Sequence, residues 1–196
     1  MQANARIPHE KLKKDYIEIL KFCECIKFGH FTFKSGKTSN VYCDLRSLPS
    51  YPIQFKFIVQ GIGYQLRLNK SLKKCDLVCG VPHGAVPLAT AIAYEFGRPL
   101  IWCRKEAKEH GLKKMIEGQF KKGQKVLVVE DVTTTGGSVL ECIEILEQEG
   151  LEVEMVYVIM DRREEGSGGN IGDKYPMTSL LDLDDLKDQY ANLEQN

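Results

Sequence analysis

Short apolar runs alternate with longer stretches of helical periodicity over most of the chain after Asp76. The apolar runs occupy 76–81, 99–103, 125–131 and 153–161, and the helix candidates between them occupy 86–97 and 137–149. Buried parallel strands have this appearance because helices cover both faces of their sheet. Strands and helices in alternation form a doubly wound sheet with right-handed crossovers. We therefore predict an α/β fold whose central, mainly parallel sheet is flanked by helices.

The segments before and after this alternation have other periodicities. Apolar residues at three- to four-residue spacing predict helices over about 9–26 and 53–69. An alternating pattern over 28–48, broken by a glycine-containing turn at 35–40, predicts a hairpin. Near the C-terminus we expect a glycine-rich loop over 164–176, then a short strand and a helix at 177–181 and 182–190. Since no long linker interrupts the chain, we predict one domain over 1–196.

Charge and hydropathy exclude some classes of partner. The chain carries 27 basic and 27 acidic residues, so no global positive field suggests nucleic acid as a partner. No run approaches the ~18 apolar residues that a membrane-spanning helix requires, and the N-terminus lacks the pattern of a signal peptide. We expect a cytoplasmic protein with no nucleic-acid partner and no membrane partner.

Seven cysteines are scattered along the chain, at positions 23, 25, 43, 75, 79, 103 and 142. None forms a CxxC pair, and no His/Cys grouping has the spacing of zinc ligands. An odd number of scattered thiols is typical of a reducing compartment. A free thiol in an apolar run behaves as a small hydrophobic side chain, so we interpret these cysteines as buried and inert.

The stretch VLVVEDVTTTGGS (126–138) has the features of a phosphate site. A strand ending in Glu130 and Asp131 leads into a hydroxyl-rich loop and then a helix. Ligands bind at the carboxyl ends of strands in open α/β sheets, and a helix N-terminus there offers free N–H groups to a phosphate. Two glycines permit close approach of the backbone, and four hydroxyls add donors. The residues of this loop are Thr133, Thr134, Thr135, Gly136, Gly137 and Ser138.

The two acids beside this loop restrict what the ligand can be. Carboxylates next to a phosphate are favourable if the ligand donates hydroxyl hydrogen bonds, or if Mg²⁺ lies between them. The stretch is neither a Walker A loop nor a GxGxxG fingerprint. The alternative is an ordinary strand–turn–helix with a Thr or Ser N-cap. The stretch resembles the 5-phosphoribosyl-1-pyrophosphate (PRPP) motif of type I phosphoribosyltransferases. That resemblance implies that Glu130 and Asp131 bind the ribose hydroxyls and the loop holds the 5′-phosphate.

Two segments indicate which nitrogenous base would accept the ribose phosphate. FTFKSGKTSNVYCDLR (31–46) resembles the substrate-side segment of orotate phosphoribosyltransferases, with Asn40 at a usual proline. Lys34 offers a positive charge and Tyr42 an aromatic surface, which suit a planar anionic base; the alternative for Lys34 is a solvated residue beside a turn. In MDRREEG (160–166), Arg162 matches the family's arginine for the orotate carboxylate, and a guanidinium fork suits that role. Arg163 is expected at the surface.

CGVPHGAVPLATAIA (79–93) is similar to the pyrophosphate loop of the same family. A Gly-x-Pro-x-Gly turn before a helix can direct backbone amides at a pyrophosphate. We expect His83 to fill a slot where the family commonly has tyrosine, rather than to act in acid–base catalysis. Gly84 stands where lysine or threonine is frequent. Both residues are predicted to contact PRPP.

RKEAKEHGLKKMIEGQF (104–120) is a local basic cluster. Its charge alone indicates a solvated loop. It also resembles the mobile catalytic loop of orotate phosphoribosyltransferases, which reaches into the neighbouring subunit's active site. The resemblance implies catalytic roles for Lys108, Lys105 and His110, and contact of Arg104 with PRPP across a homodimer.

The resemblance extends over about residues 20–181. It implies that about 1–50 form a substrate-side hood and about 70–181 the PRPP-binding core. The expected reaction converts orotate and PRPP to orotidine 5′-monophosphate and pyrophosphate in UMP biosynthesis. Mg²⁺ is expected to be held mainly by PRPP, with Asp131 as the candidate protein contact.

Three further expectations concern the whole chain. Its length leaves no room for an orotidylate decarboxylase domain, so we expect a monofunctional protein. One alternative is a phosphoribosyltransferase for another base, which need not carry Lys34 and Arg162. The other is a non-catalytic PRPP-sensing regulator, although the loop lysines are present and the N-terminal extension is too short for a winged helix.

Overall fold

A computed structural model describes residues 9–32, 36, 38–68, 70–104, 115–163 and 171–191. Its centre is a six-stranded sheet with the order β5-β4-β3-β6-β7-β8. The strands are β3 (Leu77–Gly80), β4 (Leu100–Cys103), β5 (Ile116–Glu117), β6 (Lys125–Thr133), β7 (Glu152–Asp161) and β8 (Met177–Asp182). All neighbouring pairs are parallel except β4 with β5. The predicted mainly parallel sheet is confirmed. The short antiparallel strand β5 was not predicted.

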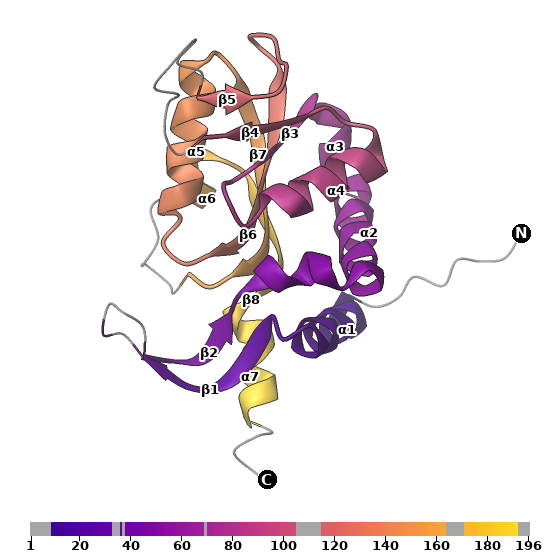
Figure 1. The fold of residues 1–196 in the computed structure, drawn as a ribbon, viewed down its shortest axis with the longest axis vertical. Helices are drawn as coiled ribbons and strands as arrows, with labels where there is room; N and C mark the ends of the chain where they lie inside the picture. Colours follow the sequence, from indigo (N-terminus) through magenta and orange to yellow (C-terminus); the bar gives the residue numbers. More distant parts are fainter. Residues whose placement is uncertain are drawn as a thin grey trace, which may run out of the picture.

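Helices cover both faces of this sheet. Figure 1 shows α5 (Gly137–Gln148) on one side and α2 (Pro52–Leu68) with α4 (Val86–Phe96) on the other. Two short helices, α3 (Ser71–Lys74) and α6 (Ile171–Lys174), complete the outer layers. The predicted helices at 53–69, 86–97 and 137–149 are therefore present within one residue of their bounds.

Strand β6 shows why its sequence is continuously apolar. Val126 and Val128 pack into the cluster that includes residues of α5, whereas Leu127 and Val129 pack into the cluster under α2 and α4. All four are fully buried. Because side chains alternate between the faces of a strand, both faces of β6 require hydrophobic residues.

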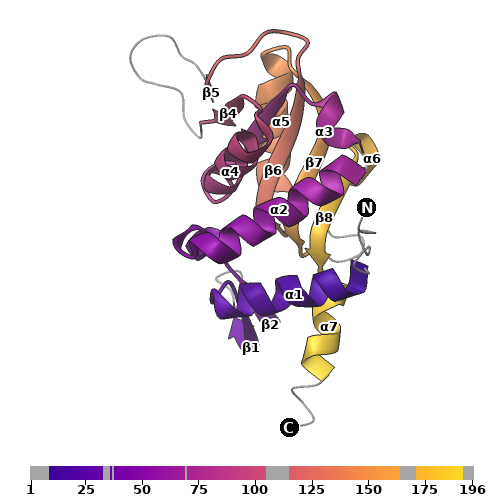
Figure 2. The same cartoon turned by 90° about the vertical axis from the view of Figure 1, so that its right-hand side faces the viewer.

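A smaller layer lies at the carboxyl end of the strands. It contains α1 (His9–Phe22), the antiparallel hairpin of β1 (Ile26–Thr32) with β2 (Thr38–Cys43), the 3₁₀ helix η1 (Leu45–Ser50) and α7 (Leu183–Ala191). Figures 1 and 2 show this layer below the sheet, with β8 leading into α7. The predicted hairpin and C-terminal helix are confirmed. One hydrophobic cluster joins this layer to the sheet through Leu20, Val41 and Leu181.

Two predicted boundaries were wrong. The first helix ends at Phe22 instead of about residue 26. Glu24 adopts a left-handed φ of 55°, while the N–H groups of Glu24 and Cys25 donate to Lys21 O and Leu20 O. This is a Schellman ending formed without glycine. The predicted loop over 164–176 contains α6, while residues 164–170 lie outside the described part. Among the described residues, no helix is long and apolar enough to cross a membrane.

Candidate active site

Two carboxylates occupy the carboxyl end of β6. Glu130 is only 6% exposed, and burial, together with the neighbouring Asp131, raises its pKa to about 9. The Asp131 N–H donates to Glu130 Oε1 at 3.0 Å, and the Val132 N–H donates to Asp131 Oδ1 at 2.9 Å. Without a ligand, Glu130 therefore holds a proton at neutral pH. A partner that donates hydrogen bonds to the carboxylate would favour its release.

The phosphate loop follows these acids directly. After β6 ends at Thr133, the chain reaches Gly136 at a left-handed φ of 80°, and α5 begins at Gly137. The N-cap residue Gly136 has no side chain to cap this helix. The Gly137 N–H donates a long hydrogen bond of 3.4 Å to Thr135 Oγ1, and the other N–H groups of the first turn can bind an anion. Thr133 Oγ1 is buried, and the described residues offer it no hydrogen-bond partner. An unpaired buried hydroxyl costs about 1–3 kcal/mol.

The turn between β3 and α4 packs against the β6 carboxylates. A Cβ added at Gly84 would lie 2.9 Å from Asp131 Cγ, and closer still to one of its oxygens. Gly80, at the end of β3, allows α4 to pack closely on that strand, because an added Cβ would lie 2.9 Å from Val86 Cα. The sequence predicted that Gly84 and Asp131 serve one ligand. The structure places them in contact.

His83 and Arg104 share a hollow of about 690 Å³. Its lining comes from the β3–α4 turn and the end of β4, and comprises Pro82, His83, Val86, Pro87, Trp102, Cys103 and Arg104. Arg104 Nη1 donates to Glu117 Oε1 of β5 at 2.7 Å. This ion pair orients the guanidinium at the point where the predicted catalytic loop begins.

Arg162 joins the hood to the phosphate loop. Its Nη2 donates to Ser39 Oγ at 3.1 Å and to Val41 O at 3.0 Å, both in β2. Its backbone N–H donates to Thr133 O at 2.8 Å. Tyr42, adjacent to Val41, has its ring centroid 5.6 Å from that of Phe31. The structure thus joins Arg162 to β2, the strand that carries Tyr42.

Two polar residues of this region, Asp44 and Ser39, were not singled out in the sequence, and a third, Arg163, was misplaced. Asp44 accepts two hydrogen bonds from the Arg46 guanidinium, which lower its pKa to about 2, and a longer one from Tyr42 Oη at 3.4 Å. Ser39 was also missed, because only the fold brings it to Arg162. Arg163 was expected at the surface. Instead it is half-buried and binds Asp161 through Nε and Nη2, at 2.9 and 2.8 Å.

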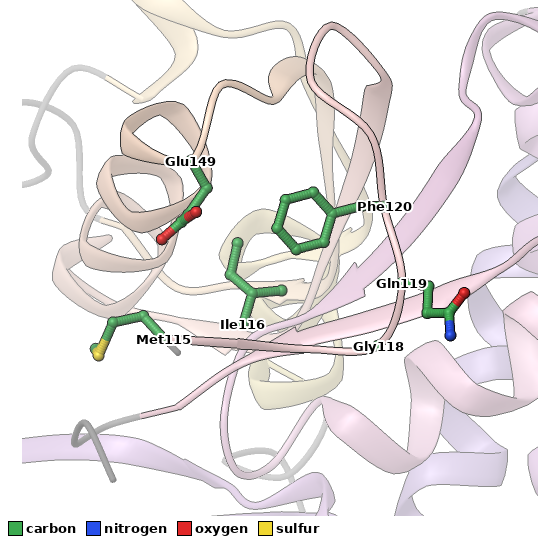
Figure 3. A pocket seen from close by; sticks show the side chains of 6 residues that line it. All are labelled: Met115, Ile116, Gly118, Gln119, Phe120 and Glu149. Carbon is green, nitrogen blue, oxygen red and sulfur yellow. The ribbon is translucent and has the colours of Figure 1, made fainter. Parts of the chain in front are cut away.

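Four predicted residues lie outside the described part of the chain: Lys34, Lys105, Lys108 and His110. A further hollow of about 390 Å³ lies between β5, the segment that follows it and the C-terminal end of α5. Figure 3 shows Ile116, Phe120 and Glu149 around it. No residue predicted for the site lines this hollow, so we assign the active site to the carboxyl end of the sheet.

Comparison with known proteins agrees with this geometry. Residues 52–174 match the family profile of the phosphoribosyl transferase domain, which covers β3, the phosphate loop and all of β7. The chain belongs to the phosphoribosyl transferase family and, within it, to the orotate phosphoribosyltransferases, as its relatives show.

The chain is 44% identical over 176 residues to orotate phosphoribosyltransferase from Pyrococcus abyssi, covering 88% of this chain and 95% of the relative. The structure of UMP synthase from Leishmania donovani superposes with a TM-score of 0.76 at 35% identity. That match covers 94% of this chain and 38% of the synthase. The PRPP complex of Mycobacterium tuberculosis orotate phosphoribosyltransferase has a TM-score of 0.63 at 29% identity, covering 88% and 99%. The prediction of a pentosyltransferase is confirmed.

Proposed function

We propose that this protein transfers the phosphoribosyl group of PRPP to orotate, giving orotidine 5′-monophosphate and pyrophosphate in pyrimidine biosynthesis. The observation that carries the choice of base is Arg162. Its guanidinium binds β2 through Ser39 and Val41, and Tyr42 is the next residue of that strand. A planar fork of donors fits a carboxylate, and an aromatic face fits a flat ring. Lys34 supplies a further positive charge for the anionic base.

PRPP would lie along the carboxyl ends of β3 and β6. Its 5′-phosphate takes the N–H groups at the start of α5 and hydroxyls from Thr133–Thr135 and Ser138. A phosphate oxygen would also satisfy the buried Thr133 hydroxyl, which has no partner among the described residues. The ribose hydroxyls donate to Glu130 and Asp131, and the pyrophosphate faces the turn at His83 and Gly84. A solved relative holds PRPP itself.

Mg²⁺ fits this site. The acids at the end of β6 offer carboxylate oxygens, which are the hard ligands Mg²⁺ prefers. Asp131 lies against Gly84, between the proposed ribose and pyrophosphate positions, and is the candidate protein ligand. Mg²⁺, carried mainly by PRPP, would supply charge neutralisation for the pyrophosphate.

The protein's part in the reaction is positioning and electrostatic stabilisation. The orotate nitrogen attacks as an anion, so little proton transfer is required, and the ribose carbon passes through an oxocarbenium-like state. Lys108, with Lys105 and His110 beside it, stabilises the departing pyrophosphate, and the closed loop excludes water. Arg104 contacts pyrophosphate across a homodimer with shared active sites.

An assay of pyrophosphate release tests the reaction. Orotate, uracil, adenine and hypoxanthine are compared at equal concentration, each with and without Mg²⁺. We expect release with orotate and Mg²⁺. Release with a purine alone would contradict the choice of base, and tight PRPP binding without release on any base would indicate a regulator.

Lys108→Ala tests the catalytic loop. We expect kcat to fall by about 10²–10³-fold, the range seen when one donor to a developing charge is removed. The matched control is Lys122→Ala, an exposed lysine just before the amino end of β6, whereas the proposed site lies at the carboxyl end. A near-normal kcat for Lys108→Ala would remove that residue from the chemistry.

A further inference from the structure

Three cysteines from distant parts of the sequence meet beneath the active site. The Sγ atoms of Cys79, Cys103 and Cys142 all lie within 4.8 Å of one another. The distance from Cys142 to Cys103 is 3.1 Å, and that from Cys79 to Cys142 is 3.8 Å. All three side chains are at most 2% exposed. Inert hydrophobic thiols need not direct their sulfur atoms at a common point.

The spacing of the sulfurs suits a metal ion. Bonds of about 2.3 Å to sulfur place the three ligands of a trigonal ion about 4 Å apart. The 3.8 Å separation meets this spacing as it stands, and the 3.1 Å pair must open by less than about 1 Å. Among the described residues, no histidine or carboxylate joins the group. A set of three sulfurs favours a soft ion over the four-coordinate geometry of structural zinc.

An entry path is also present. A hollow of about 260 Å³ lies beside the cluster and is lined by both Cys103 and Cys142. Its other walls include Arg104, Ser138 and Glu141. The hollow therefore extends to two of the three cysteines, so that an approaching ion needs only local side-chain movement to reach their sulfurs.

We propose that Cys79, Cys103 and Cys142 form a binding site for one soft monovalent ion, copper(I) or its redox-inert analogue silver(I). Binding replaces thiol protons with metal–sulfur bonds and releases those protons to solvent, so no electron transfer is involved. The site goes beyond the proposed transferase activity. Cys103 precedes Arg104 at the end of β4, Cys142 lies in α5, and Cys79 lies in β3 before the pyrophosphate turn. A bound ion would connect the three elements that carry the phosphate contacts.

Anaerobic titration of the reduced full-length protein with silver(I) tests the proposal, followed by copper(I) supplied from a coloured chelator complex. We expect one ion per chain and a higher thermal midpoint on loading, since a ligand that binds only the folded state stabilises it. Cys142→Ala and, independently, Cys79→Ala should each weaken affinity by more than the 10–100-fold typical of losing a metal's outer-shell partner.

The control variant is Cys23→Ala, which removes an equally buried thiol outside the cluster. It should bind like the unaltered chain. Phosphoribosyl transfer by each unloaded variant verifies that its active site is folded. The proposal is overturned if no ion binds, if both cluster variants retain full affinity, or if Cys23→Ala weakens binding as much as they do. Preference for Zn²⁺ over both soft ions would also contradict it.

Discussion

The residues proposed to hold the ribose phosphate come from one continuous stretch, 130–138. Those proposed for the base come from two distant segments: Lys34 and Tyr42 lie in 34–42, and Arg162 directly follows β7. The first group is positioned by local geometry: a strand end, a left-handed glycine and a helix start. The second depends on hydrogen bonds such as Arg162 to Ser39, 123 residues apart. We call the first group the phosphate half and the second the base half. PRPP binding should therefore be sensitive to changes of the backbone in the phosphate half, and orotate binding to the loss of single side-chain contacts in the base half.

Among the changes that separate the two halves, the largest effect is expected from Gly84→Ala, in the turn that packs against Asp131 of the phosphate half. The new methyl group would overlap the Asp131 carboxylate and displace the turn from β6. Since misplacement of about 1 Å can reduce rates 10²-fold, we expect kcat/KM for PRPP to fall by about 100-fold. Steady-state kinetics provide the measurement. Gly172→Ala, where nothing lies within 4 Å of the added Cβ, should be neutral. Equal effects of the two changes would contradict the packing argument.

PRPP affinity should also depend on pH through Glu130. Its pKa is raised to about 9 in the free protein, and ribose hydroxyls favour the ionised form. Between pH 7 and pH 9, affinity should rise by up to about tenfold per pH unit, because binding requires loss of one proton. Calorimetry in two buffers of different ionisation enthalpy would detect that proton. Glu130→Gln should abolish its release, and unchanged release in this variant would assign the proton elsewhere.

The same carboxyl group affects stability. In the unfolded chain Glu130 ionises near the ordinary glutamate pKa of 4.5, whereas in the folded chain it retains its proton to about pH 9. The folded state binds the extra proton, so the free energy of unfolding falls as pH rises between these values. We expect Glu130→Gln to raise the free energy of unfolding at pH 8 by about 1–3 kcal/mol while weakening PRPP binding. Denaturant unfolding at pH 5 and pH 8 is the test, and a variant with the original pH dependence would contradict it.

Ser39→Ala should have the smallest effect, and only in the base half. It removes one hydrogen bond to Arg162 and leaves the bond to Val41 O. A loss of about 0.5–1.5 kcal/mol corresponds to an orotate KM raised about 2- to 10-fold, with PRPP affinity unchanged. An equal change in both substrates would show that the halves are coupled through the Arg162 backbone bond to Thr133 O.

The difference between the halves also explains what the sequence could predict. Strand β6 and the start of α5 were predictable because burial on both faces and the loop residues leave local signals. Gly84 and Asp131 could be assigned to one ligand, but their contact depends on the packing of β3 against β6. The two-residue strand β5 has no periodicity, and its place is set by pairing with β4. The thiol cluster could not be predicted from the sequence, because Cys142 lies 63 residues from Cys79 and 39 residues from Cys103.

The central claim is that Arg162 selects the base while the β6–α5 loop binds the ribose phosphate independently of it. The direct test is the ratio of kcat/KM for orotate to that for uracil, in the unaltered protein and in Arg162→Lys, which retains the charge but lacks the planar fork. We expect a high ratio in the unaltered protein and a fall of about 10- to 100-fold in the variant, for a loss of about 1.5–3 kcal/mol in a charged hydrogen bond. PRPP affinity should not change. An unchanged ratio, or equal use of uracil by the unaltered protein, would contradict the account.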